Sequence, residues 1–422
     1  MPHDLLLTGG HVIDVGGGRT GCFDVAVRDG RIADVAPALP RDAHEIVDVS
    51  GRVVTPGLVD LHTHVHPGAT YWGIDPDPVA WYSGVTTWVD AGSAGAYTLD
   101  GLRGAARRAA VRVPALLNIA APGLAARTGE GRDLAHCDVD LAVATVSANR
   151  DLVAGIKVRI DAETVGANGV EPLRRGLRAA AACAVPVMVH IGAAPPALGE
   201  VLDLLRPGDI VTHCASAIAA VSDSGAVAPA VRDAHARGVL FDIGHGSGGF
   251  AFDVLEAQLA AGIVPHTVST DLHARSVYGP AFDLPTTMAK LLAVGMALDD
   301  VVAAATVRPA RALALPGGAG TLTPGAAADI AVFRLEDGPF ELVDAHRQLR
   351  RAPRRLVNEA TYVAGRRLPP RLPAPPPPWI PLTDAQRKAL RQREDALRVL
   401  LTDPLVDADG LAEQFPRPRP VH

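Results

Sequence analysis

The hydrophobic residues of this chain fall into short runs that recur at intervals through its middle. Gly, Pro and polar residues bound these runs, as they bound β-strands, and stretches with helical spacing of apolar residues separate several of them. Strands that alternate with helices are typical of a parallel sheet, so the pattern predicts an α/β protein with a TIM (β/α)8 barrel at residues 55–318. The runs lie at 59–65, 85–90, 115–119, 153–160, 185–191, 210–214, 239–243 and 267–271, and the helix-like stretches include 169–183, 198–205, 227–238 and 253–262.

Strand-like runs also occur on both sides of the barrel. Before it they are short and broken by Gly and Pro, and after it they return at 329–335 and 357–363. Because strands from both flanks can pair, we expect one small β-sandwich domain built from residues 1–54 and 319–368. The early runs lie at 5–7, 24–27, 31–35 and 46–49.

A proline-rich segment follows the second flank. Prolines crowd residues 369–381, which predicts an extended, semi-rigid strap, and residues 383–401 have helical spacing of apolar residues. Residues 369–422 are thus expected to form a Pro-rich strap and a C-terminal helix, and we expect the helix to dock on its own barrel or on a sister subunit. The alternative is that its helix binds another protein.

The composition indicates a globular protein with a large core. The chain has 422 residues, of which 48% are hydrophobic, and a formal net charge of -6, so it can bury a large core and shows no basic surface for nucleic acid or anionic membranes. Neither a transmembrane run nor a secretory signal is readable. The cysteines lack the CxxC spacing of a thiolate zinc site or a disulfide scaffold, which favours a cytoplasmic location; they are Cys22, Cys137, Cys183 and Cys214.

Lys157 lies inside an apolar run, although lysine is rare in this chain. Three lysines stand among 40 basic residues, and the other 37 are arginines. An unpaired ammonium in a buried strand is costly, so this position needs a chemical reason. A primary amine can take up CO2, and the resulting carbamate is a carboxylate on a long stem that can bridge two metal ions. Lys157 therefore predicts a binuclear metal site.

Candidate metal ligands stand at the ends of other predicted strands. His62 and His64 are two residues apart, so both side chains point to one side of their strand. His190, His213 and Asp271 end further strands, at the barrel edge where TIM-barrel enzymes place their active sites. Nitrogen and oxygen ligands suit zinc, and a bridging carbamate is useful only with a second ion. We expect two divalent ions, Zn²⁺ in the first instance, and a CO2-derived carbamate on Lys157.

These residues also lie in strings that resemble the amidohydrolase superfamily. The first is 54–64, VTPGLVDLHTH, followed by 155–159, GIKVR, and 269–273, STDLH, in the order found in its binuclear, carboxylated-lysine members. The strings at 244–250, GHGSGGF, and 282–288, FDLPTTM, resemble its amidohydrolase/deacetylase group, which is described as dihydroorotase-like and includes an esterase for O-acetylated α-hydroxy acids.

The resemblance implies a role for each ligand. His62, His64 and Asp271 would hold the more buried ion, and His190 and His213 the more exposed one. Carbamylated Lys157 and a hydroxide would bridge the two ions. Asp271 would be the catalytic residue that carries a proton from the attacking hydroxide to the leaving group.

Other residues near the predicted site are open to two interpretations. Arg159 and Arg275 either bind a substrate carboxylate or form structural ion pairs. His245 and His273 either bind substrate or orient the metal ligands. Asp60, beside the HxH pair, is expected to be a structural anchor.

The sequence thus predicts a metal-dependent hydrolase that cleaves an acyclic amide or ester through the bridging hydroxide. The substrate would be a small molecule of the N-acyl amino acid or O-acyl hydroxy acid type, which makes the enzyme a deacetylase, and we expect a homo-oligomer. The chain lacks the GxSxG string of serine hydrolases. Three alternatives remain: a cyclic amide hydrolase of the dihydroorotase or hydantoinase kind, a mononuclear deaminase, and a non-catalytic scaffold.

Overall fold

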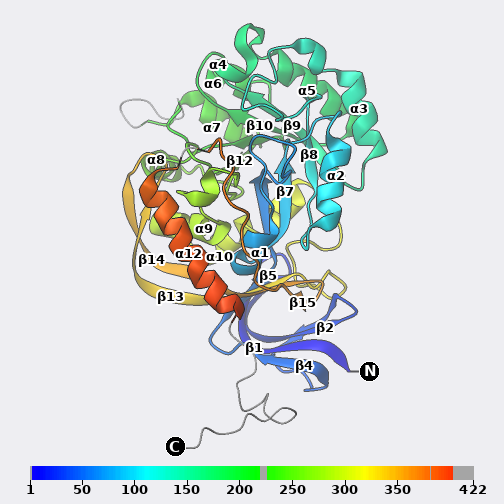
Figure 1. Ribbon diagram of the computed structural model, residues 1–422, viewed down its shortest axis with the longest axis vertical. Helices are drawn as coiled ribbons and strands as arrows, with labels where there is room; N and C mark the ends of the chain where they lie inside the picture. The colour runs from blue at the N-terminus through cyan, green and yellow to red at the C-terminus, as the bar shows by residue number, and fades with distance from the viewer. Residues whose placement is uncertain (1, 219–225, 381, 403–422) are drawn as a thin grey trace, which may run out of the picture.

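A computed structural model describes residues 2–218, 226–380 and 382–402, and the end of the predicted C-terminal segment lies outside these ranges. A curled parallel sheet forms the centre of the molecule (Figure 1), with its strands hydrogen-bonded in chain order. The strands are β6 (Leu58–Thr63), β7 (Val85–Ala91), β8 (Ala115–Asn118), β9 (Val153–Ile160), β10 (Val187–Ile191), β11 (Ile210–Thr212) and β12 (Leu240–Asp242).

Residues 267–272, the closing segment, complete the barrel. Parallel bridges join Thr267 to Asp242 of β12 and Leu272 to Thr63 of β6. The segment is not a regular strand, because Asp271 has a left-handed backbone with φ 46° that breaks the ladder. Asp60 compensates by accepting hydrogen bonds from the N–H and the hydroxyl of Thr270, at 2.9 and 2.6 Å. The predicted TIM-barrel fold is confirmed, and Asp60 anchors its last segment.

Helices cover the outside of the barrel, and the apolar core lies between them and the sheet. The packing is close: a Cβ on Gly176 of α5 would lie 2.4 Å from Val158 Cγ2 of β9, so only glycine fits there. The helices are α1 (Asp77–Ser83), α2 (Leu99–Arg108), α3 (Val139–Ala148), α4 (Ala162–Val165), α5 (Glu171–Cys183), α6 (Leu198–Leu202), α7 (Pro229–Ala236), α8 (Phe252–Ala260), α9 (Leu284–Ala293), α10 (Leu298–Ala304) and α11 (Val307–Ala312), with 3-10 turns η1 (Leu134–His136), η2 (Gly166–Asn168) and η3 (Ser276–Tyr278).

A second sheet of eight strands combines the two flanks of the chain, as predicted. Its order is β15-β14-β13-β5-β1-β2-β3, with β4 also paired to β1, and the antiparallel β5–β13 pair joins the flanks. The sheet has a core of its own around Leu7, Val25 and Ile330. Its strands are β1 (His3–Asp14), β2 (Arg19–Arg28), β3 (Arg31–Ala36), β4 (Ala43–Asp48), β5 (Val53–Pro56), β13 (Ile330–Val343), β14 (Leu349–Val363) and β15 (Arg366–Arg367).

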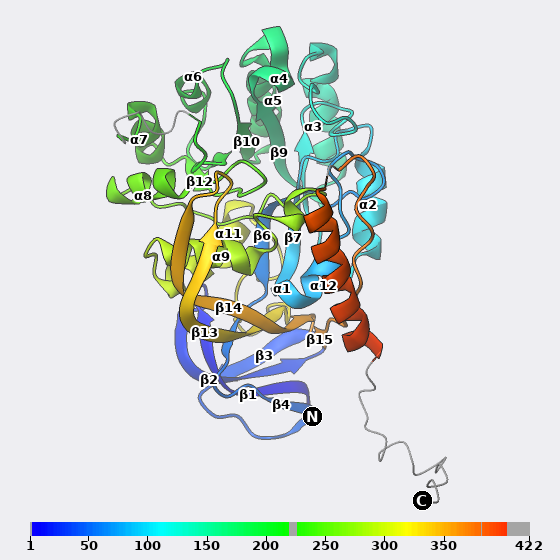
Figure 2. The ribbon, with the colours of Figure 1, turned by 60° about the vertical axis from the view of Figure 1, so that its left-hand side comes forward.

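The strap packs against the barrel of its own chain. Trp81 donates its indole N–H to Arg371 O at 3.2 Å, and the Arg371 guanidinium pairs with Asp77. Farther along, Trp379 donates its indole N–H to Tyr71 O at 3.2 Å. The helix that follows, α12 (Asp384–Thr402), lies on the outside of the molecule in both ribbon views (Figures 1 and 2).

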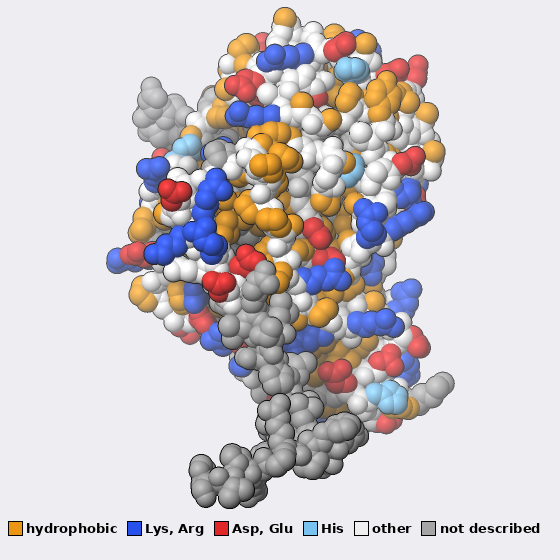
Figure 3. Space-filling model, viewed as in Figure 1, with side chains coloured by type: hydrophobic (Ala, Val, Ile, Leu, Met, Phe, Trp, Pro, Cys, Tyr) orange, Lys and Arg blue, Asp and Glu red, His pale blue; other side chains and the backbone are white. Residues whose placement is uncertain are grey.

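Charged side chains of both signs are interspersed over the face shown in Figure 3. This distribution agrees with the nearly balanced composition of 40 basic and 46 acidic residues. Among the described residues, no helix has the length and apolar character needed to cross a membrane.

Candidate active site

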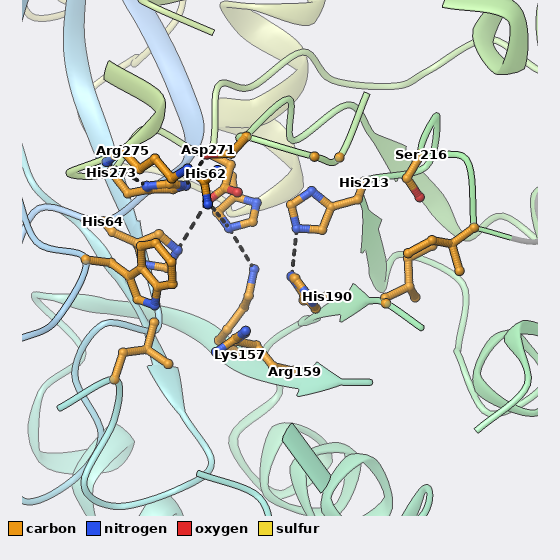
Figure 4. A pocket seen from close by; sticks show the side chains of 18 residues that line it. His62, His64, Lys157, Arg159, His190, His213, Ser216, Asp271, His273 and Arg275 are labelled. Carbon is orange, nitrogen blue, oxygen red and sulfur yellow. Dashed lines mark hydrogen bonds and ion pairs between the residues drawn. The ribbon is translucent and has the colours of Figure 1, made fainter. Parts of the chain in front are cut away.

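A pocket of about 310 Å³ opens at the carboxyl ends of the barrel strands. All six predicted metal ligands line it (Figure 4), although they come from five different strand ends. They are His62 on β6 and His64 just after it, Lys157 on β9, His190 on β10, His213 just after β11, and Asp271 in the closing segment.

His62, His64 and Asp271 form a group of three buried ligands, here called the metal triad. Asp271 Oδ1 lies 3.3 Å from His62 Nε2 and 3.2 Å from His64 Nε2. Two imidazole nitrogens and one carboxylate oxygen are donors that suit zinc and similar divalent ions. The chemistry and spacing of the triad therefore fit one divalent cation.

Buried hydroxyls fix the orientation of both histidines of the triad. His62 Nδ1 is 2.8 Å from Thr212 Oγ1, and that hydroxyl donates to Asp242 Oδ2 at 2.7 Å. Since the hydroxyl proton is used on Asp242, His62 must donate from Nδ1 and keep the Nε2 lone pair for a metal. His64 repeats the pattern, because its Nδ1 is 2.9 Å from Ser93 Oγ.

His190 and His213 converge on the other side of Lys157. His190 Nδ1 lies 2.7 Å from His213 Nε2, and His213 Nδ1 donates to Gly244 O at 2.5 Å. The His213 and His62 rings are 5.2 Å apart between centroids. A second pair of imidazole rings thus stands next to the triad.

Lys157 points between the two groups of ligands. Its Nζ is 3.1 Å from His62 Nε2 and 3.1 Å from Met188 Sδ, and the side chain is fully buried. Gly92 makes room for its stem, since a Cβ there would lie 2.6 Å from Lys157 Cβ and Cγ. Burial lowers the pKa of the amine from 10.5 to about 7. A neutral amine, the form that reacts with CO2, is therefore available near neutral pH.

Burial also keeps the imidazoles neutral. It lowers the pKa of His64 to about 3 and of His213 to about 4, and it also lowers the pKa values of His62 and His190 well below 6.5. Neutral imidazole is the form that binds a metal. No proton has to be removed from these histidines at neutral pH.

The backbone is strained at two of the predicted ligands. His213 and Asp271 have positive φ values of 64° and 46°, a region that residues with a Cβ seldom adopt. Each such residue costs on the order of 1 kcal/mol or more and persists only where its surroundings impose it. Here the left-handed turns aim both side chains into the pocket.

The weaker predicted residues divide between the pocket and its surroundings. Arg159 lines the pocket but is paired with Glu130 at 3.2 Å, as the ion-pair interpretation requires. Arg275 is exposed at the rim and has no acidic partner among the described residues. His273 lines the pocket, whereas His245 is fully buried outside the pocket wall, so it does not face substrate.

His273 presents a hydrogen-bond donor to the pocket. Its Nδ1 accepts from the backbone N–H groups of Arg275 and Ser276, at 3.1 and 3.3 Å. The proton of the neutral ring must then be on Nε2, which lies 3.5 Å from Ser247 Oγ. Trp72 packs edge-on against this ring with centroids 4.7 Å apart.

Several residues of the site were not predicted from the sequence. Thr212, Ser93 and Asp242 support the triad from segments far away in the chain. Ser216 lines the pocket, and its buried hydroxyl has no hydrogen-bond partner within the described part of the chain. Isolated Ser, Thr and Asp residues carry no distinctive spacing, so no sequence signal marks them.

Comparison with known proteins agrees with this geometry. Residues 53–367 match the model of the amidohydrolase family. A deacetylase from Agrobacterium fabrum is 39% identical over 356 residues, which cover 81% of this chain and 87% of that protein. The structure of an adenine deaminase has 31% identity and a TM-score of 0.82 over 86% of this chain and 99% of that one. A dihydroorotase structure has 36% identity and a TM-score of 0.78 over 87% and 99%.

Proposed function

The chain belongs to the amidohydrolase family of hydrolytic enzymes, and on this premise we propose that it removes an acyl group from an acyclic amide or ester with the help of two divalent ions. The observation that carries the proposal is the convergence of five histidine and aspartate ligands on one buried lysine, all within one pocket. Zinc suits this mixture of nitrogen and oxygen donors.

Lys157 is the residue that favours two ions over one. Its Nζ lies between the metal triad and the His190–His213 pair, and within the described chain no carboxylate lies within ion-pair distance of it. Addition of CO2 to the neutral amine gives a carbamate and releases one proton. The carbamate would be a carboxylate ligand for the two ions, and their positive charge would offset the negative charge that CO2 addition creates.

The protein groups divide the work of hydrolysis between them. When bound, the two ions supply a low pKa for water and a positive charge near the substrate carbonyl. Asp271 Oδ1 lies within 3.3 Å of both triad histidines, so its other oxygen is free to accept the proton of the attacking water and pass it to the leaving group. We propose that the Nε2–H of His273, which lines the pocket, donates to a substrate oxygen.

Deacetylation is favoured by the similarity to the Agrobacterium fabrum deacetylase. A substrate with a carboxylate is favoured by Arg275. This arginine stands at the rim of the pocket without an acidic partner among the described residues, so it is available to pair with that carboxylate. We therefore propose N-acetyl amino acids or O-acetyl hydroxy acids as the substrate class. A cyclic amide is the second candidate, since the dihydroorotase structure has 36% identity.

Parallel assays test the proposal. Purified, zinc-loaded enzyme is offered N-acetyl amino acids, O-acetyl hydroxy acids, dihydroorotate, hydantoins and adenine, and bound zinc is measured by mass spectrometry. We expect about two zinc ions per chain and turnover of an acetylated acid. Turnover of dihydroorotate or a hydantoin alone would support the second candidate. Deamination of adenine with one ion per chain would refute both.

The carbamate has a separate test. Wild-type enzyme and Lys157→Met are loaded with zinc in 13C-labelled bicarbonate, and the carbamate carbon is sought by NMR. We expect the signal in the wild type alone, and in the variant we expect loss of one zinc ion and of most activity. A fully active Lys157→Met enzyme, or a wild type without the signal, would contradict the bridging role.

A further inference from the structure

Lys290 is a second fully buried lysine, and the proposed hydrolysis does not use it. It lies on α9 with 1% of its surface exposed. Its Nζ is 2.6 Å from His245 Nε2 and donates to Pro280 O at 2.8 Å. Among the described residues no carboxylate lies within ion-pair distance of this amine; the acidic groups that act on it from farther away are Asp344 and Asp283.

The two partners of Lys290 belong to two different loops of the active site. His245 is in the β12–α8 loop (residues 243–251), and Pro280 is in the loop after the closing segment (residues 273–283). The first loop gives Ser247, Gly248 and Gly249 to the pocket wall, and the second gives His273 and Arg275. The amine of Lys290 therefore ties together two of the segments that surround the predicted metal site.

The β12–α8 loop also contacts two predicted metal ligands directly. Gly244 O accepts the Nδ1 proton of His213 at 2.5 Å. A Cβ on Gly246 would lie 2.4 Å from Asp271 Oδ2, and one on Gly249 would lie 2.4 Å from His213 Nδ1. Because the loop approaches both ligands this closely, we expect a displacement of the loop to move His213 or Asp271 as well.

The direction of the Lys290–His245 bond is determined by the ring. His245 Nδ1 lies 2.9 Å from Gly246 O, so it carries the ring proton, and Nε2 has the lone pair that accepts from Lys290. The ring also stacks on Phe250 with centroids 4.9 Å apart. His245 is thus held on three sides, and Lys290 fixes the side that faces α9.

Stability alone does not explain a lysine at this position. Burial of an amine without a carboxylate partner is costly, and an apolar side chain of similar volume is usually neutral or stabilising in such a place. The chain has three lysines in all, and this one bonds only to active-site loops among the described residues.

We propose that Lys290 is a positioning residue, which holds the β12–α8 loop and the 273–283 loop in register and so keeps His213 and Asp271 in place for metal binding and catalysis. The proposal rests on the proposed metal-dependent function. It assigns Lys290 no contact with substrate, and it gives His245 a supporting role in place of substrate binding.

The test compares Lys290→Met and Lys290→Arg with Lys388→Met as control, because Lys388 is exposed on α12. Zinc affinity is measured by competition with a chelator, kcat and KM with the best substrate, and Tm by calorimetry. For Lys290→Met we expect an approximately 10-fold weaker second zinc ion and a kcat lowered about 10-fold or more with a smaller change in KM. Its Tm should equal or exceed that of the wild type.

A double variant adds a second criterion. His245→Phe combined with Lys290→Met should lose no more activity than either single variant, because both remove the same bond. Lys290→Arg should retain more activity than Lys290→Met. The proposal would be overturned if Lys290→Met had the zinc affinity and the kcat of the wild type. It would also be overturned if the activity lost in this variant were fully explained by a smaller amount of folded protein. Zinc affinity is measured without substrate, so it tests the role of Lys290 even if the substrate class is wrong. Failure of the proposed deacetylation is detected separately, as a lack of turnover by the wild-type enzyme.

Discussion

The two histidines of the metal triad each bond to a hydroxyl that is itself bound by a buried carboxylate. For His62 the chain of bonds runs through Thr212 to Asp242, and for His64 it runs through Ser93 to Asp90. The pKa of both aspartates is raised, because the effect of burial is larger than the opposing effect of the hydrogen bonds to their oxygens. Their role is to hold the hydroxyl protons so that each histidine donates from Nδ1 and faces the site with Nε2.

Replacement of Thr212 by valine should weaken zinc binding. Valine keeps the volume of the side chain but leaves His62 Nδ1 without its partner, so the ring loses both its orientation and its fixed tautomer. We expect a zinc affinity about 10-fold lower, and activity that recovers when excess zinc is added. Chelator competition and kcat at several zinc concentrations measure both effects.

Thr55→Val is the matched control for Thr212→Val. Thr55 is equally buried, but it lies on β5 in the other sheet and its hydroxyl donates to Pro56 O at 2.8 Å. This variant should lose some stability and keep its zinc affinity. An equal loss of zinc affinity in the two variants would show that Thr212 acts through general stability and not through His62.

Ser216 should contact the substrate. Its hydroxyl is buried in the pocket wall and lacks a partner within the described residues, and such a group costs free energy unless a ligand or water bonds to it. Ser216→Ala is expected to raise KM about 3- to 10-fold, the worth of one hydrogen bond, with little change in kcat. Ser83→Ala, a buried serine on α1 away from the pocket, should leave KM unchanged. Unchanged KM in Ser216→Ala for every substrate turned over would refute the contact.

The sequence predicted the candidate metal ligands, but it did not predict the residues that hydrogen-bond to them and hold them in place. Strand ends of a barrel meet at one edge, so the positions of His62, His190 and His213 in the chain were enough to predict that they share a pocket. The bond from His62 to Thr212 spans 150 residues. A lone threonine at that distance has no local pattern, and only the folded barrel brings it next to the ring.

At the scale of elements, the strap connects the C-terminal segment to the pocket. Trp379 bonds to Tyr71 O and its ring lies 6.1 Å from the Tyr71 ring, between centroids. Tyr71 packs against Trp72, and Trp72 packs against His273 in the pocket wall. The strap thus supports the loop between β6 and α1 from outside.

Removal of the strap should therefore change substrate binding more than metal binding. A chain ending at residue 368 loses the contacts to Tyr71 and Asp77, and the Trp72 loop gains freedom that must be lost again when substrate binds. We expect KM to rise several-fold, while zinc content stays at the wild-type level because the triad lies on the barrel. Steady-state kinetics and metal analysis test this expectation.

Trp379→Ala is the milder form of the same experiment, and it should reproduce part of the KM effect. Trp81→Ala breaks a different strap contact, the bond to Arg371 O, on α1. It serves as the comparison. Loss of zinc from the truncated chain, or an unchanged KM, would contradict a role of the strap in supporting the pocket wall.

The sequence predicted the elements correctly where a continuous run of apolar residues marks them. The barrel strands were predicted because buried parallel strands are nearly continuous apolar runs, as in β9 and β10. The predicted runs at 329–335 and 357–363 are only parts of β13 and β14, which extend as a long hairpin. The backbone ladder joins the two strands of this extension, and exposed arginine and glutamate pairs such as Arg351 with Glu341 lie across them. Charged residues of this kind carry no apolar period.

At the scale of the whole molecule, two buried lysines make the stability of the metal-free protein depend on pH. Burial lowers the pKa of Lys157 and of Lys290 from 10.5 to about 7 in the folded state. Between these values the unfolded chain binds the proton and the folded chain does not. Unfolding then takes up protons, so the stability of the folded state must rise with pH in this interval.

The buried histidines act in the same direction as the lysines, and buried acids and thiols act in the opposite direction, but both mostly outside the window from pH 7.5 to 8.5. Burial raises the pKa of Asp60 to about 7, so its folded form holds a proton that is largely gone by pH 8. Burial also raises the pKa of Cys137 to about 11 and that of Cys214 well above 9.0, and these thiols lower stability only as pH approaches 9. The two lysines therefore dominate the change inside the window.

Metal-free, CO2-free protein should become more stable by up to about 1 kcal/mol per pH unit for each lysine between pH 7.5 and 8.5. Urea unfolding at fixed salt concentration measures the slope. Lys157→Met and Lys290→Met should each remove about half of it, and the double variant should be nearly flat. A slope that persists in the double variant would mean that neither lysine loses its proton on folding, and the neutral amine needed for CO2 addition at Lys157 would then be missing.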